Sequence, residues 1–129
     1  MLVSTSFVRD VGTMQEDYFL YLEELDWAFR GRPRYALGYA VRSRVYHKAG
    51  ASTRRRSEFS LGLLYRNQVK FASRFMPERL PALRRKFVLE WVKHLIRWQL
   101  VEAKVVGRTL REFHAIAGSV SAVTQRLTG

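Results

Sequence analysis

Apolar residues recur at three- and four-residue intervals through the second half of the chain, which is the period of an amphipathic helix. Residues 59–75 fit one helix, and Pro77 is expected to end it because proline cannot donate a helical hydrogen bond. From Pro81 onwards the same period continues through Phe87, Val88, Trp91, Val92, Leu95 and Ile96. We therefore predict that this half is helical, with a break near Gly107 and a fraying tail from Gly118.

The first half has shorter and less regular patterns. Two brief helices are predicted at residues 6–11 and 23–30, because Gly12 and Gly31 follow them directly. Three short strands are predicted at residues 1–4, 35–40 and 44–47, the last two around a turn near Arg42 and Ser43. The predicted fold class is therefore α/β, with a few short strands followed by mostly helices.

The composition limits the kinds of structure and binding site that the chain can form. The chain has 129 residues, of which 47% are hydrophobic, and it contains no cysteine. A globular domain is expected, whereas disulfides and zinc–thiolate sites are excluded. No signal peptide pattern and no run of about 20 apolar residues is present.

The positive charge is concentrated in the second part of the chain. The formal net charge is +12, of which residues 1–53 carry +1 and residues 54–129 carry +11. A field of this sign attracts nucleic acid, anionic membranes and phosphorylated substrates alike. Charge alone does not choose among these partners.

Residues 10–26 contain carboxylates and no basic side chain. The carboxylates are Asp10, Glu16, Asp17, Glu23, Glu24 and Asp26. One interpretation is an ordinary helix start, where the helix dipole favours acidic residues and Asp26 pairs with Arg30 four residues later. The other is a general base that takes the proton from an attacking hydroxyl. Spacing leaves both open.

Four segments in a fixed order carry a family resemblance. They are EDYFLYLEELDWAFR at residues 16–30, RVYHKAGAS at 44–52, YRN at 65–67, and Pro77. Together they resemble family 2 glycosyltransferases of GT-A type, especially rhamnosyltransferase-like members. The resemblance implies that residues 1–77 are the acceptor-side, carboxyl-terminal part of a catalytic domain. Residues 78–117 are interpreted as a basic amphipathic helical extension, and residues 118–129 as a disordered tail.

The resemblance implies a hexosyltransferase that moves a sugar from a nucleotide-sugar donor to a saccharide or lipid-linked acceptor, with inversion, in cell-surface polysaccharide synthesis. Glu24 would be the catalytic base and Asp26 the next candidate, which would orient Arg30 or an acceptor hydroxyl. The residues implied to bind substrate or diphosphate are Glu23, Arg30, Ser52, Thr53, Arg66 and Asn67. His47 would approach a divalent metal, Mg or Mn, whose other ligands come from an upstream Asp-x-Asp motif. These 129 residues contain no Asp-x-Asp, so we expect the chain alone to be inactive.

The basic helical segment supports an alternative function. Residues 79–111 carry nine Lys/Arg against Glu90 and Glu102, together with Trp91 and Trp98. This combination is typical of a helix in a membrane interface, but also fits a helix that packs its apolar stripe on its own domain. A small module binding an anionic membrane or nucleic acid is therefore the alternative. Nucleic acid is disfavoured because no RNP-like strand, GxxG loop or zinc spacing occurs. A cytoplasmic location is expected, with peripheral attachment to the inner face of the cell membrane left open.

Overall fold

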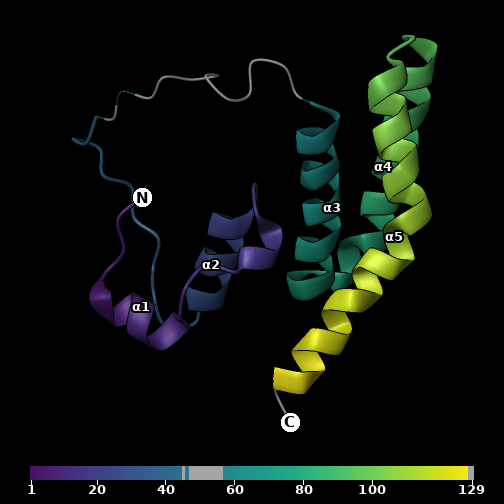
Figure 1. The fold of residues 1–129 in the computed structure, drawn as a ribbon. Helices are drawn as coiled ribbons and strands as arrows, with labels where there is room; N and C mark the ends of the chain where they lie inside the picture. The colour runs from purple at the N-terminus through teal and green to yellow at the C-terminus, as the bar shows by residue number, and fades with distance from the viewer. Residues whose placement is uncertain (45, 47–56, 128–129) are drawn as a thin grey trace. The chain divides into compact units, whose positions relative to one another are not determined.

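A computed structural model of the chain describes residues 1–44, 46 and 57–127. The chain forms two compact units, Met1–Arg55 and Arg56–Gly129, which we call the first unit and the second unit. Every regular element of the described residues is a helix (Figure 1). In this part of the chain, no helix combines the length and the apolar character that crossing a membrane requires.

Two short helices, α1 (Thr5–Val11) and α2 (Glu23–Gly31), form the first unit together with the 3-10 turn η1 (Glu16–Tyr18). The Ser4 hydroxyl caps α1 by accepting a hydrogen bond from the Phe7 N–H at 3.1 Å. The Phe7 ring packs edge-on against Trp27 of α2 and against Tyr35, with ring centroids 5.0 Å apart in both pairs. Gly31 allows this approach, because a Cβ at that position would overlap the Phe7 ring.

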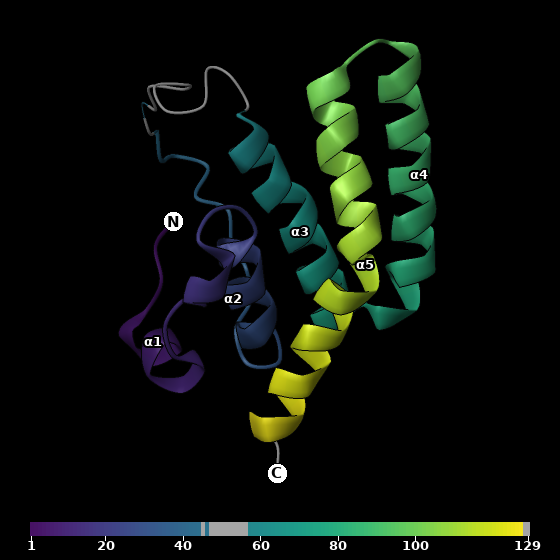
Figure 2. The same cartoon turned by 45° about the vertical axis from the view of Figure 1, so that its right-hand side comes forward.

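Three longer helices form the second unit. They are α3 (Glu58–Phe75), α4 (Leu80–Ile96) and α5 (Leu100–Leu127), with the 3-10 turn η2 (Pro77–Arg79) between α3 and α4. At one end Lys104 of α5 pairs with Glu58 of α3 at 2.9 Å, and further along the Ser73 hydroxyl donates to the Ala117 carbonyl at 2.8 Å. Helices α3 and α5 are therefore parallel, whereas α4 and α5 form an antiparallel hairpin (Figure 2).

The core of the second unit is apolar and comes from all three helices. Its buried members are Val69, Phe87, Val106, Phe113 and Ile116. The fully buried Phe87 ring lies 5.0 Å from the Tyr65 ring and 6.2 Å from the Phe113 ring, both edge-on. Val69 and Phe87 belong to the helical apolar period described from the sequence, and the prediction of a helical second half is confirmed.

The α/β prediction is wrong for the described residues. Residues 1–4 and 35–40 are not strands, and neither are Arg44 and Tyr46, while residues 45 and 47 of the third predicted strand lie outside the described part. Leu2, Leu37 and Tyr39, which belong to two of the predicted strands, are 99%, 83% and 89% exposed. A strand is stable only when its backbone groups pair with a neighbour, and alternation in one segment does not supply that neighbour.

The break in the final helical region lies at residues 97–99, eight to ten residues before its predicted position near Gly107. Helix α4 ends at Ile96 and α5 begins at Leu100, so Gly107 lies inside α5. A Cβ on Gly107 would come within 3.0 Å of Trp91 Nε1 on α4. Gly107 therefore serves close helix packing rather than chain reversal. Helix α5 also continues past Gly118 to Leu127.

Candidate functional site

The first turn of α2 carries three of the predicted site residues, Glu23, Glu24 and Asp26. The approach to this turn is strained, because Phe19, Tyr21 and Leu22 have φ angles of 59°, 69° and 69°. Such backbone conformations cost non-glycine residues about 1–3 kcal/mol each and concentrate at functional sites. These backbone conformations therefore lower the local stability of the segment before the carboxylates.

Asp26 is completely buried, and both of its carboxylate oxygens are engaged. Oδ2 accepts a hydrogen bond from the Tyr18 hydroxyl at 3.0 Å, and Oδ1 accepts one from Arg30 Nε at 2.9 Å. The pairing of Asp26 with Arg30 expected from their spacing is thus present. This geometry makes Asp26 a positioning residue that fixes Tyr18 and Arg30.

Arg30 extends the same network to the end of α1. Its Nη1 donates to the Val11 carbonyl and its Nη2 to the Thr13 carbonyl, both at 2.6 Å. Trp27 Nε1 donates to the neighbouring Gly12 carbonyl at 2.8 Å. Carbonyls at the end of a helix lack intrahelical donors, so these side chains satisfy them and join α1 to α2. Three Arg30 nitrogens are therefore used inside the unit.

The two adjacent glutamates differ in their surroundings. Glu24 is exposed to solvent, whereas Glu23 is partly buried. The Glu23 Oε2 atom is enclosed and has no hydrogen-bond partner among the described residues. Of the three carboxylates in this turn, Glu24 is consequently the one open to an incoming hydroxyl.

Asp10 makes a separate hydrogen bond, outside the network around Asp26 and Arg30. Its Oδ2 accepts a hydrogen bond from the Tyr35 hydroxyl at 2.7 Å. This hydrogen bond to a carboxylate raises the pKa of Tyr35 above its ordinary value of 10.0. Asp10 therefore serves the contact between α1 and the segment after α2.

The remaining predicted site residues are on the second unit or outside the described part. Arg66 is exposed on α3 and lines a hollow of about 510 Å³ between α3 and α5, together with Arg108 and Glu112. Asn67, the next residue, is buried, with 1% exposure. His47, Ser52 and Thr53 lie outside the described residues. The structure thus gathers Glu23, Glu24, Asp26 and Arg30 on one helix, and Arg66 and Asn67 on another.

The described residues do not make a metal centre. In residues 1–44, 46 and 57–127, no group of three or more His, Cys, Asp or Glu side chains is placed to hold a metal ion. The carboxylates in this part of the chain have different partners: Asp26 contacts Tyr18 and Arg30, whereas Asp10 contacts Tyr35. No chemical step is therefore assigned to a metal held by these side chains.

Tyr18 is a partner of Asp26 that the sequence analysis did not single out. It precedes Asp26 by eight residues, and the positive-φ residues Phe19, Tyr21 and Leu22 lie between Tyr18 and the start of α2. Neither the helical nor the strand period relates two residues across such a segment. The only sequence feature that could have drawn attention to Tyr18 is the aromatic run that precedes the acidic residues of α2.

Comparison with known proteins adds no relative. No family model, no curated protein and no solved structure matches the chain.

Proposed function

We propose that this chain supplies the acceptor side of an inverting glycosyltransferase, with the Glu24 carboxylate as general base. The proposal starts from the ordered segments that resemble family 2 glycosyltransferases. One structural observation supports the choice of base: Asp26 has both oxygens occupied inside the first unit, whereas Glu24, two residues earlier on the same turn, is exposed. A general base needs an accessible oxygen within hydrogen-bond reach of the proton that it takes.

In the proposed reaction Glu24 removes the proton from a hydroxyl of a saccharide or lipid-linked acceptor. The acceptor oxygen then forms a bond to the anomeric carbon of the nucleotide sugar, and the bond from that carbon to the diphosphate breaks. The nucleoside diphosphate leaves with the electron pair. Because the acceptor oxygen attacks from the face opposite the diphosphate in a single displacement, the anomeric configuration inverts. Asp26 and Arg30 hold the helix that presents Glu24, and do not take part in proton transfer.

The donor side is expected to come from residues that are not in this sequence. Relatives of the resembled family bind the nucleotide sugar in a strand-rich half with an Asp-x-Asp motif, and a divalent cation there would neutralise the leaving diphosphate. No Asp-x-Asp occurs in these 129 residues. We therefore expect the 129-residue chain to give no turnover with any nucleotide sugar. Metal-dependent release of nucleoside diphosphate by this chain alone would contradict that division.

The test uses a transferase in which these residues are joined to a donor-binding half, sought in the DNA immediately upstream of the Met1 codon. There we expect Glu24→Gln to lower turnover by about 10²–10⁴ while donor affinity is unchanged, since a general base acts in the transition state. Glu16→Gln is the matched control, because it removes another exposed carboxylate, from η1. A Glu24→Gln enzyme with near-normal turnover would remove Glu24 from the role of base.

A further inference from the structure

Helix α4 is apolar on two faces, and the second unit covers one of them. Leu80, Leu83 and Phe87 face the core. A second stripe at three- and four-residue spacing remains exposed, and its members are Val88, Leu89, Val92, Leu95 and Ile96. A helix of a globular protein ordinarily carries polar residues on the face away from its core. The exposed stripe of α4 is therefore unexplained by the packing of the second unit.

The exposed stripe leads to the turn between α4 and α5. There Trp98 is 83% exposed, next to Ile96 at 73% and Leu100 at 62%. This turn forms one end of the hairpin, where the chain reverses (Figure 1). A contiguous group of large apolar side chains at a helix turn marks an interaction surface.

Trp98 occupies a position that favours glycine. The Trp98 N–H donates to the Leu95 carbonyl at 3.1 Å and the Gln99 N–H to the His94 carbonyl at 3.0 Å. These two hydrogen bonds form a Schellman motif, in which the residue at the Trp98 position has a positive φ, here 55°. Glycine adopts this conformation without strain, whereas tryptophan does not. A tryptophan here neither relieves strain nor fills the core, so folding does not account for it.

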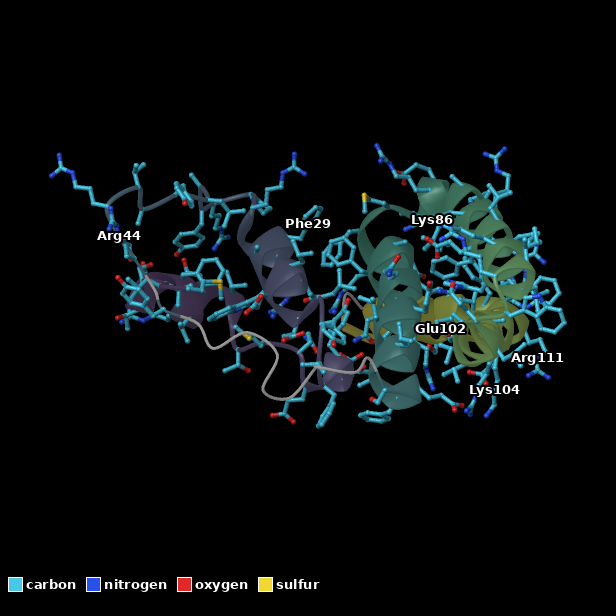
Figure 3. The ribbon with its side chains drawn as sticks, turned by 90° about the horizontal axis from the view of Figure 1, so that it is seen from above. Phe29, Arg44, Lys86, Glu102, Lys104 and Arg111 are labelled. Carbon is cyan, nitrogen blue, oxygen red and sulfur yellow. The ribbon has the colours of Figure 1, made fainter. Side chains whose placement is uncertain are left out.

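Basic side chains border the apolar stripe. By helical spacing Lys86, Lys93 and Arg97 follow one edge of it, and all three are exposed, with Lys86 3.8 Å from Glu90. On α5, Arg111 lies exposed at the edge of the second unit, and so does Lys104, which pairs with Glu58 (Figure 3). Residues 79–111 carry nine Lys/Arg against two Glu. The surface therefore combines exposed tryptophan and aliphatic residues with a net positive charge.

We propose that the α4–α5 hairpin docks on the surface of a lipid bilayer that contains anionic lipid. Trp98, Ile96 and Leu100 enter the headgroup region, while Lys93 and Arg97 contact lipid phosphates. Nucleic acid would use the basic residues but would leave the aliphatic ones in water, whereas an anionic bilayer uses both. This inference does not depend on glycosyl transfer, and either proposal can fail without the other.

The first experiment measures binding of the full 129-residue chain to phosphatidylcholine vesicles with and without phosphatidylglycerol. We expect binding to the anionic vesicles and a blue shift of tryptophan emission that the Trp98→Gly chain, which keeps Trp27 and Trp91, does not show. Trp98→Gly should weaken this binding about tenfold, the effect of losing one large buried apolar side chain. Its thermal midpoint should not fall, because glycine suits the turn, so a loss of binding cannot be attributed to unfolding. Tyr39→Gly removes an aromatic side chain of similar exposure from the first unit and should bind as the unsubstituted chain does.

The second experiment tests the charges. Lys93→Gln and Arg97→Gln should each weaken binding to anionic vesicles about fivefold at low salt, and added salt should reduce the difference. Arg34→Gln and Arg42→Gln are matched controls, because they remove exposed arginines from the first unit. Equal affinity for neutral and anionic vesicles would overturn the proposal, as would unchanged binding by Trp98→Gly. Tighter binding to duplex DNA at matched salt would assign the surface to nucleic acid, and a dimer that Trp98→Gly dissociates would assign it to a second copy. Either result would overturn docking to lipid.

Discussion

The first unit buries a hydrogen-bonded polar group beside its Phe7 and Trp27 rings, whereas the main buried cluster of the second unit is apolar. In the first unit Asp26, Tyr18 and Arg30 form a hydrogen-bonded group that reaches the carbonyls at the end of α1. In the second unit Phe87 and Val106, both fully buried, sit among other hydrocarbon side chains. Hydrogen bonds are directional, so the first group requires each of its members, while an apolar core tolerates gradual changes in volume.

The two kinds of buried centre constrain their surroundings differently. A polar network fixes the orientation of a helix turn, which is what a catalytic carboxylate such as the proposed Glu24 requires. An apolar core gives stability without directing any one side chain. The second unit also carries the exposed apolar stripe of α4, which does not contribute to the packing of its core.

Phe87→Ala should produce the largest loss of stability in the second unit. Truncation of a fully buried phenylalanine costs about 3–5 kcal/mol, from lost transfer energy and from the cavity. Leu89→Ala on the same helix is the control, because Leu89 is 72% exposed and its truncation should change stability by less than about 0.5 kcal/mol. Urea unfolding followed by circular dichroism compares the two. Similar losses for both would mean that the outer stripe of α4 is buried in solution.

Asp26→Asn should destabilise the first unit by about 3 kcal/mol, because it removes the buried negative charge that pairs with the Arg30 guanidinium. The measurement is hydrogen exchange resolved by residue, with faster exchange expected in α1 and α2 and unchanged exchange in α5. Glu24→Gln removes an exposed carboxylate from the same turn and should leave exchange as it was. Faster exchange in the second unit alone, or no change in α2, would contradict the role given to Asp26 in holding α1 and α2 together.

The smallest effect concerns Tyr35. Its pKa is raised by the hydrogen bond to Asp10, so the neutral phenol is favoured in the folded chain. The corresponding stabilisation is fully present below the unfolded pKa of about 10 and is lost as pH rises through the higher folded pKa. Asp10→Asn should bring the Tyr35 titration back towards lower pH in ultraviolet difference spectra. Glu16→Gln, a carboxylate change elsewhere in the unit, should not move it.

The sequence predicts the helices better than it predicts their contacts. Glycines and apolar periods are local signals, and they placed α1, α2 and α3 within one residue of their observed bounds. The strand over residues 35–40 was wrong because its alternation describes one segment, whereas a strand also needs a partner. The turn after α4 was missed because it uses Trp98 where the sequence rule expects glycine. The pairing of Asp26 with Arg30 follows from a four-residue helical spacing, but its burial and its link to Tyr18 depend on a loop with no repeating geometry.

The parallel course of α3 and α5 brings together residues that are far apart in the sequence. Their contact between Ser73 and Ala117 joins residues 44 positions apart, so closing it restricts a long stretch of chain that includes the whole of α4. The α4–α5 turn closes between residues five positions apart, His94 and Gln99. Loop-closure entropy therefore favours early formation of the hairpin and late docking of α3. On a ribosome, the apolar face of α3 would wait for α5 to be synthesised before it could be covered.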